Sequence, residues 1–575
     1  MQEINYCAVQ TFFLEEIFMA VPIRTRSSAV RVVGSLVWVA TTSLGSMLAG
    51  ADAVADDLIT IALTGEQAPD AEPGVVFTGL GTPVLNASGQ TAFLAELNGT
   101  GVDAGNNRGI YSEGGGPLAE VTRTGNQAPG ADTGVLFTNL RTPLLSASGQ
   151  TAFRSDLTGT GVDSTNNRGI YRDNGGTLAQ VARTGNQAPD ANPGVVFSGL
   201  NFPVFNASGQ TAFRGDLTGT GVDSTNNVGV YSEGGGSLAE VARTGDPASG
   251  GDPGVLFSGL DTPVLNDSGQ TAFVARLTGS GVTLGNNSEG VYKESGGLLA
   301  EVVRTGDQAP GADPGVLINS FFEITPVLNN SGQAAFATGL RGTGVDSTNN
   351  RGIYGEGSGS LDEVAREGGQ AADAASGVVF SSLSEPLINA SGQTAFAARL
   401  TGTGVSGTND TGIYREIDGA VAEVAREGEQ APDAESGVVF RTFGFGFQAF
   451  NALGQIVFSV GLNGTSVDAT NDRGLYATDL DGLLVEIIRE GDLLDVNDDP
   501  LIEDLRTVSS FSLFANSGNE DGRVSGFNDL GQVAFQASFT DGSEGIFVSS
   551  FVAIPEPATA LLLVLGAPLF LRRRG

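Results

Sequence analysis

The chain has 575 residues, no histidine and one cysteine, and 65 acidic against 29 basic residues give a formal net charge of −36. The lack of histidine excludes histidine general bases and histidine-ligated zinc, and a single cysteine excludes an internal disulfide. An acidic surface repels nucleic acid and anionic lipid, so neither is predicted as a partner.

The N-terminal segment has the pattern of an export signal. Arginines from Arg24 onward precede an apolar run at residues 32–48, and small residues at 51–55 fit the small-x-small cleavage pattern. We therefore predict a signal peptide region at residues 1–55, with Met19 as the expected start. Its removal would also remove Cys7, which leaves no cysteine nucleophile in the mature chain. The alternative is an N-terminal membrane anchor.

A short motif with the pattern Asn-x-x-Gly-x-x-Ala-Phe returns about every 60 residues. A period of this length is typical of propellers, solenoids and related arrays. The eight copies begin at Asn86, Ser146, Asn206, Asn266, Asn329, Asn389, Asn451 and Asn528.

One repeat, residues 66–125, predicts four strands joined by turns. A Pro- and Gly-containing acidic loop precedes short β-prone pieces at 75–77 and 83–85, and Asn86 to Gly89 is expected to form a tight turn. The strand at 91–97 places Phe93, Ala95 and Leu97 on one face, which favours core packing over ligand stacking. Strands at 109–111 and 118–123 complete an antiparallel sheet.

The strand count favours a closed ring over an open array. The third strand occurs eight times, but the fourth follows only the first seven copies, and residues 58–65 match the fourth-strand sequence at 178–185. The N-terminal strand therefore supplies what the last unit lacks, and closing the ring leaves no unpaired edge. We predict an all-β fold, an eight-bladed β-propeller over residues 56–551. The alternatives are two smaller packed arrays or an open β-solenoid.

The repeated pattern resembles a family of bacterial surface proteins that is named for tandem repeats of this motif. The resemblance spans residues 58–550, with departures at Ser146 and at Val457, which replaces the motif alanine. It implies the architecture and a surface location, and no defined activity.

The loops between the second and third strands are rich in Asp and Asn. Oxygen ligands of this kind suit Ca²⁺, although the same residues are the ordinary choice for turns and the spacing is not that of an EF-hand. The last unit also carries acidic insertions at residues 492–500 and 519–522. No other cofactor is predicted. The candidate calcium ligands are Asp103, Asp163, Asp223, Asp346, Asp468, Asp495 and Asp498.

The C-terminus, residues 552–575, resembles the PEP-CTERM sorting signal. It has the triplet Pro555, Glu556 and Pro557, then an apolar run at 558–571 that is short for a membrane span, then Arg572, Arg573 and Arg574. The resemblance implies transient membrane insertion through this helix, an exosortase-type membrane protease as partner and exopolysaccharide-producing bacteria as the setting. The alternative is an ordinary tail anchor.

These features predict an exported protein of the cell surface or extracellular matrix that is not an enzyme. Such a propeller would act in adhesion or bind exopolysaccharide or another surface glycan. One alternative is an extracellular carbohydrate-active enzyme with carboxylates and arginines in the central channel; another is a surface-layer protein that binds only itself. The near-identical repeats favour binding, because an enzyme needs an asymmetric site.

Overall fold

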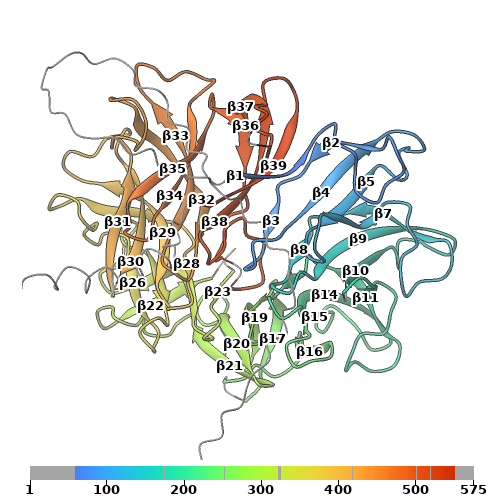
Figure 1. Cartoon of the computed structure of the whole chain (residues 1–575). Coiled ribbons are helices and arrows are strands. Elements are labelled where there is room, and N and C mark those ends of the chain that lie inside the picture. The colour runs from blue at the N-terminus through green and yellow to red at the C-terminus, as the bar shows by residue number, and fades with distance from the viewer. Residues whose placement is uncertain are drawn as a thin grey trace, which may run out of the picture. The chain divides into compact units, whose positions relative to one another are not determined.

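Eight antiparallel sheets surround a common centre (Figure 1). The computed structural model describes residues 58–550 apart from 174, 251–252, 322–324, 418, 500 and 519. All of these residues belong to one unit, and they contain no α-helix. The predicted eight-bladed propeller is thereby confirmed. The predicted export segment and sorting signal lie outside the described residues.

The first four blades each contain four strands and one short additional strand. Blade 1 consists of β2 (Val76–Leu80), β3 (Val84–Leu85), β4 (Thr91–Asn98), β5 (Arg108–Ser112) and β6 (Ala119–Arg123). Blade 2 consists of β7 (Val135–Leu140), β8 (Leu144–Leu145), β9 (Thr151–Gly159), β10 (Arg168–Asp173) and β11 (Leu178–Arg183). Blade 3 consists of β12 (Val195–Leu200), β13 (Val204–Phe205), β14 (Thr211–Gly219), β15 (Val228–Ser232) and β16 (Ala239–Arg243). Blade 4 consists of β17 (Val255–Leu260), β18 (Val264–Leu265), β19 (Thr271–Gly279), β20 (Glu289–Ser295) and β21 (Leu298–Arg304).

Blades 5 and 6 repeat this plan, and blades 7 and 8 modify it. Blade 5 consists of β22 (Val316–Ser320), β23 (Val327–Leu328), β24 (Ala334–Gly342), β25 (Arg351–Gly355) and β26 (Asp362–Arg366). Blade 6 consists of β27 (Val379–Leu383), β28 (Leu387–Ile388), β29 (Thr394–Thr401), β30 (Thr411–Ile417) and β31 (Ala420–Arg426). Blade 7 consists of β32 (Val439–Phe450), β33 (Ile456–Asn463), β34 (Arg473–Thr478) and β35 (Leu484–Arg489). Blade 8 consists of β36 (Leu493–Asp495), β37 (Leu505–Ser512), β38 (Gln532–Phe539), β39 (Glu544–Ser550) and β1 (Leu58–Leu63).

The N-terminal strand closes the ring. β1 pairs antiparallel with β39, with Leu58 opposite Ser549 and Thr60 opposite Phe547. It is the outermost strand of blade 8, the place that β6 takes in blade 1. The predicted closure is thus confirmed, and it pairs the edge of β39 that would otherwise be left open.

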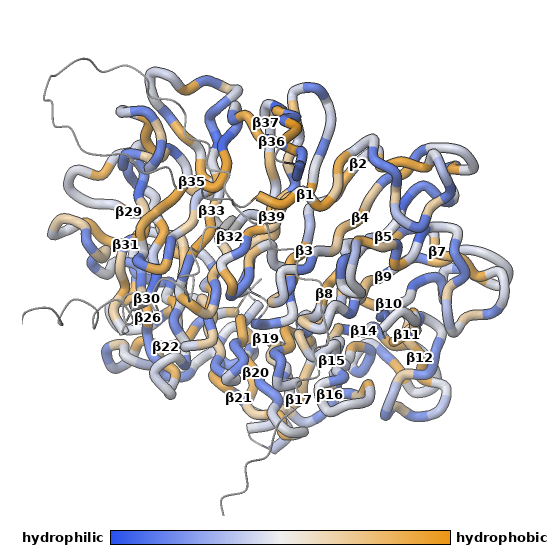
Figure 2. Tube along the Cα trace, viewed as in Figure 1, coloured by the Kyte–Doolittle hydropathy of each residue, from blue (hydrophilic) through white to orange (hydrophobic). Residues whose placement is uncertain are grey.

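Alternating side chains build the core between blades. Phe93 is completely buried and stacks with Tyr111, while Phe77 meets Tyr111 edge-on with ring centroids 4.9 Å apart. The hydropathy pattern follows this alternation, with apolar stretches in the strands and polar stretches in the loops (Figure 2). The prediction that Phe93 is a core residue is confirmed.

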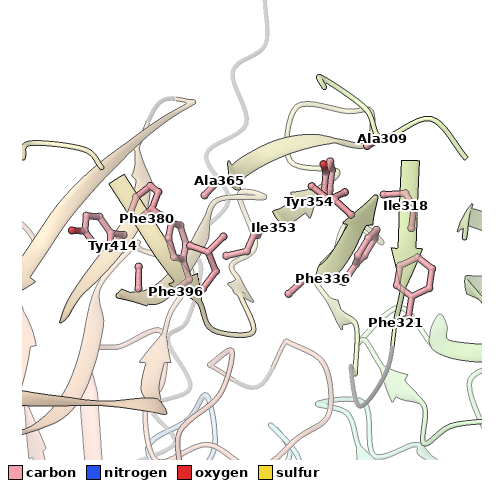
Figure 3. Close-up of a cluster of buried hydrophobic side chains, with 14 of the residues drawn as sticks. Ala309, Ile318, Phe321, Phe336, Ile353, Tyr354, Ala365, Phe380, Phe396 and Tyr414 are labelled. Atoms are coloured by element: carbon pink, nitrogen blue, oxygen red, sulfur yellow. The ribbon is translucent and has the colours of Figure 1, made fainter. Parts of the chain in front are cut away.

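Each blade also packs on the next one. Ile353 of blade 5 belongs to the same buried cluster as Phe380 and Tyr414 of blade 6. Figure 3 shows Ile353 between the ring pair Phe336 and Tyr354 and the rings of blade 6. Close packing of large side chains in this way stabilises the ring through the hydrophobic effect. In the part of the chain that the structure describes, no helix has the length and apolar character needed to cross a membrane.

The repeated motif forms a tight turn at the inner end of each blade. The Gly89 amide donates to the Asn86 carbonyl over 3.0 Å, and Gly89 has φ of +79°, a left-handed conformation that favours glycine. The Asn86 side-chain oxygen accepts hydrogen bonds from the amides of Ser88 and Gln90. The turn is therefore fixed by its own asparagine.

The same asparagines connect neighbouring blades. Asn206 is 1% exposed, and its Nδ2 donates to the carbonyl of Asn266 over 2.8 Å. Asn528 of blade 8 donates in the same way to the Asn86 carbonyl of blade 1, over 2.9 Å, so the contact also crosses the ring closure. Equivalent bonds run from Asn86 to Ser146, Asn266 to Asn329, Asn329 to Asn389 and Asn451 to Asn528. We call this set the asparagine ring.

Blade 2 tests the energetic value of the asparagine ring, because Ser146 replaces the asparagine. Its hydroxyl oxygen accepts from the Gln150 amide over 3.0 Å but cannot reproduce the Nδ2 donor. We expect Ser146→Asn to raise the free energy of unfolding by about 1 kcal/mol, and Asn206→Ser to lower it by about 1–3 kcal/mol. Urea denaturation of both variants measures these changes. The control is Ser164→Asn at an exposed loop position of the same blade. A Ser146→Asn variant no more stable than this control would contradict the role of the ring.

Candidate functional site

A segment of blade 8 occupies the centre of the ring. It comprises residues 513–526, apart from 519, and lies between β37 and the Asn528 turn. We call it the plug. In blade 1 the corresponding connection between β2 and β3 is only residues 81–83. The last two copies of the motif, which begin at Asn451 and Asn528, are farther apart in the sequence than the other copies. The additional residues between them include the plug.

The plug contacts the short innermost strands of several blades. These strands contact one another around the ring, and their inward edges have no strand partner within their own sheets. Unpaired buried backbone amides are costly, and the plug supplies acceptors for them. The bonds run from the amides of Leu85, Phe205, Leu265 and Phe450 to the carbonyls of Ser525, Gly522, Asp521 and Asn516, at 2.8–3.2 Å, and from the Ile388 amide to the Ser517 hydroxyl at 3.3 Å.

A pocket of about 350 Å³ lies where the plug meets the inner strands of blades 2 to 4. Its wall is mainly apolar, and its charged residues are Arg154 and Arg523. Among the described lining residues there is no carboxylate and no tyrosine. The lining consists of Thr142, Leu144, Arg154, Phe202, Pro203, Val204, Thr262, Pro263, Thr325, Phe514, Asn516, Arg523 and Val524.

Arg154 and Phe202 are the most distinctive side chains of this pocket. The Arg154 guanidinium carbon lies 3.8 Å from the centre of the Phe202 ring, and Phe202 is 54% exposed. Arg154 Nη1 donates to the Leu200 carbonyl over 3.0 Å, while its Nε is buried without a hydrogen-bond partner. The cation–π contact holds the guanidinium against the ring. Arg523 differs, because its Nε donates to the fully buried Asp521 over 2.8 Å.

A second, much smaller cavity of about 30 Å³ lies beside the asparagine ring. Three carboxyl groups line it, from Asp267, Asp529 and the plug residue Glu520. Burial raises the pKa of all three, and for Glu520 the nearby charges of Asp529, Asp267 and Asp521 add to burial and bring the pKa to about 7. Glu520 Oε2 accepts from the Asn330 amide over 2.9 Å. The plug thus carries a carboxyl group that binds a proton near neutral pH.

The predicted calcium ligands of the blades lie in separate loops. Asp163 Oδ1 accepts from the Thr165 amide and hydroxyl at 2.8 and 2.6 Å, and the hydroxyl bond lowers the pKa of Asp163. The carboxylates of Asp103, Asp223, Asp346 and Asp468 make the corresponding contacts in their own loops. These bonds stabilise turns.

The two candidates in the first insertion also hold backbone. Asp495 Oδ1 accepts from the amides of Asn497 and Asp504, and Asp498 Oδ1 accepts from the Thr60 amide of β1 over 3.1 Å. Within the described residues, no group of three or more acidic side chains is arranged to hold a metal ion. Calcium binding stays a prediction from the sequence.

The pocket residues Arg154 and Phe202 were not predicted from the sequence. The second insertion at 519–522 was predicted, and its residues 520–522 are part of the plug. Phe202 departs from the repeat, because blades 1, 2 and 4 have Thr82, Thr142 and Thr262 at this position. Arginine at position 154 recurs as Arg214 in blade 3, whereas blade 1 has Leu94. A position-by-position comparison of the repeats would have found Phe202.

The Glu520 carboxyl predicts a pH-dependent stability. Its pKa of about 7 lies above the ordinary glutamate value of 4.5, so between these values the native chain holds a proton that the unfolded chain has released. Stability therefore falls as pH rises through this window, by at most about 3 kcal/mol from this group. Glu520→Gln keeps an acceptor for the Asn330 amide and removes the titration.

Urea denaturation from pH 4.5 to 8 measures the effect. We expect the stability of Glu520→Gln to fall less steeply with pH than that of the wild type. Glu503→Gln, at an exposed position before β37, is the control and should follow the wild type. Equal slopes for wild type and Glu520→Gln would show that Glu520 does not titrate in this window.

Comparisons with solved structures find matches at low similarity, one of them to a β-propeller domain. The chain is similar to an oligogalacturonate lyase in complex with manganese, at 11% identity and TM-score 0.30, over 74% of this chain and 98% of the other. It is similar to a puromycin hydrolase mutant at 11% identity and TM-score 0.34, over 80% and 58%. It is also similar to the β-propeller domain of the trilobed protease from Pyrococcus furiosus at 10% identity and TM-score 0.28, over 72% and 99%.

The sequence matches none of the curated proteins with which it was compared. It does match a family of unknown function, DUF7453, over residues 39–410 and 378–561. These two matches together span most of the propeller. The chain therefore belongs to the DUF7453 family.

Proposed function

We propose that this protein is an exported surface or extracellular-matrix propeller that binds a surface glycan and is not an enzyme. Export and sorting rest on the sequence features at residues 1–55 and 552–575, with cleavage by an exosortase-type protease near Pro555, Glu556 and Pro557. Binding rests on the pocket between the plug and blades 2 to 4.

The composition of that pocket is the observation that carries the proposal. Its volume of about 350 Å³ lies in the range of small-ligand sites, and its apolar wall with a few polar groups is typical of them. Phe202 offers a half-exposed aromatic surface to a ligand, and apolar contact with such a ring contributes substantially to affinity. The plug forms one side of the pocket through Phe514 and Val524.

The chemistry of the lining supports binding over the enzymatic alternative. Glycoside hydrolysis ordinarily uses a pair of carboxyl groups, and proton abstraction needs a titratable base. The lining residues in the described part of the chain include neither a carboxyl group nor a tyrosine. The neighbouring carboxylates are engaged elsewhere, since Asp521 is paired with Arg523 and Asp156 with Arg168.

Replacement of Phe202 by the residue of neighbouring blades tests the binding function. We expect Phe202→Thr to fold normally, because threonine occupies the equivalent positions 82, 142 and 262. Loss of the ring should weaken glycan binding by roughly tenfold or more. A glycan array, with and without calcium, identifies ligands of the full-length protein, and isothermal titration then measures their affinity.

The control is Leu284→Ala, which removes a 92% exposed apolar side chain from a loop of blade 4. This variant should bind as the wild type does. Failure of the wild type to bind any glycan would instead favour a structural surface-layer protein that binds only itself. Binding that Phe202→Thr leaves unchanged would place the glycan site elsewhere.

The sorting proposal has its own test. Mass spectrometry of the protein recovered from the cell surface should find C-terminal peptides that end near the Pro-Glu-Pro triplet and lack Arg572, Arg573 and Arg574. The precursor in the membrane fraction should retain them. An intact arginine tail on the surface protein would contradict processing by an exosortase.

A further inference from the structure

We propose that the pocket binds an anionic glycan and that Arg154 contacts its negatively charged group. This inference rests on the proposed glycan-binding function and specifies the ligand class. The charged group is a carboxylate or a sulfate, as on a uronic acid or a sulfated sugar. A local concentration of arginine in blade 2 supports this proposal.

Two arginines of blade 2 share one carboxylate, and a third arginine lies beside them. Asp156 Oδ1 lies 3.3 Å from Arg168 Nε, and Asp156 Oδ2 lies 3.7 Å from Arg141 Nη2. The backbone brings them together, because the Arg141 amide donates to the Arg154 carbonyl and Arg168 pairs with Asp156 across β9 and β10. We call Arg141, Arg154 and Arg168 the arginine cluster. With Asp156 it carries a local charge of about +2 in a protein whose net charge is −36.

This concentration is particular to blade 2. The positions equivalent to 141, 154 and 168 are Gly81, Leu94 and Arg108 in blade 1, Asn201, Arg214 and Val228 in blade 3, and Asp261, Val274 and Glu289 in blade 4. The fold of a blade therefore does not require three arginines here. We therefore attribute their presence beside the pocket to a ligand and not to the folding of the blade.

Arg154 is the member of the cluster that reaches the pocket. No carboxylate of the described chain forms an ion pair with it, and its single hydrogen bond, from Nη1 to the Leu200 carbonyl, leaves the buried Nε unpaired. Burial, together with the charges of Arg168 and Arg141, lowers the pKa of Arg154. An anion bound beside the guanidinium would offset this repulsion.

The planar shape of the Arg154 guanidinium favours a carboxylate or a sulfate as the ligand group. A guanidinium is a planar fork that matches the two oxygens of a carboxylate or sulfate. Phe202 lies against the guanidinium and presents half of its own surface to solvent, so a sugar ring on Phe202 would place its charged substituent near Arg154. The long-range repulsion from the acidic surface is screened beyond about 8 Å at physiological salt, whereas contacts inside the pocket are screened much less.

A pair of polymers that differ only in charge tests the proposal. The full-length protein is titrated with oligomers of polygalacturonate and with the same oligomers after methyl esterification, and dextran sulfate and dextran form a second pair. We expect each charged probe to bind at least roughly tenfold more tightly than its neutral counterpart. A preference for one charged probe over the other distinguishes a carboxylate ligand from a sulfate ligand.

Two substitutions assign the effect to Arg154. Arg154→Leu, which installs the residue of blade 1, should abolish the preference for charged probes. Arg154→Lys keeps the positive charge but removes the planar guanidinium, so this variant should retain part of the preference for charged probes. A retained partial preference would also show that the site still folds. The control is Arg441→Leu, which removes an exposed arginine paired with Asp472 in blade 7 and should change nothing.

The outcomes separate this inference from the proposed function. If charged and neutral probes bind alike, and only Phe202→Thr weakens them, the anionic ligand is refuted while glycan binding stands. If Arg154→Leu keeps the full preference for charged probes, Arg154 is not the contact. If no glycan binds in the array or in these titrations, both proposals fail.

Discussion

A buried asparagine in seven of the eight repeats is the constraint on which this ring depends. The side chain must accept two backbone hydrogen bonds within its own turn and donate one to the next blade, as Asn86 does. Only an amide offers both an acceptor and a donor at this size: aspartate has no hydrogen to donate, and serine reaches less far. Because buried polar groups are costly when unpaired, at about 1–3 kcal/mol each, one residue type fixes both the turn and the distance between blades.

The asparagine ring also explains why the channel needs a plug. Eight blades held by turns at their inner ends leave short inner strands whose inward amides have no partner in their own sheets. The plug satisfies five of these amides from one segment, with bonds that reach blades 1, 3, 4, 6 and 7. It also packs Phe514 and Val524 against Leu145 of blade 2. A single irregular blade therefore completes the hydrogen bonding of the regular ones.

The sequence predicts the architecture well because each repeat is a contiguous segment and the copies of its motif and strands can be counted. The eight motif copies, the seven fourth strands and the match of residues 58–65 to 178–185 were enough to predict the closure that pairs Thr60 with Phe547. The plug could not be predicted in the same way. Its partners lie far away in the chain, as Ser525 and Leu85 do, and no periodicity relates them. The insertion at 519–522 was visible as an irregularity, but the position of its residues 520–522 in the channel depends on the closed ring.

For the candidate site, repetition in the sequence was a poor guide. The Asp and Asn loops drew attention because they repeat, yet residues such as Asp163 are occupied by their own turns. In an array of this kind, features common to all blades tend to be explained by the needs of a blade. A ligand site on a ring must break the symmetry, so it is sought where one blade departs from the others.

Phe202, the plug and the arginine cluster of blade 2 are such departures, and Arg154 of that cluster meets Phe202 and the plug in one pocket. Arg154 is a partly buried guanidinium beside two other arginines, and no carboxylate in the described part of the chain forms an ion pair with it. Blade 1 has leucine at the equivalent position. A guanidinium in the wall of a pocket without an ion-pair partner is therefore consistent with the anionic ligand that we propose.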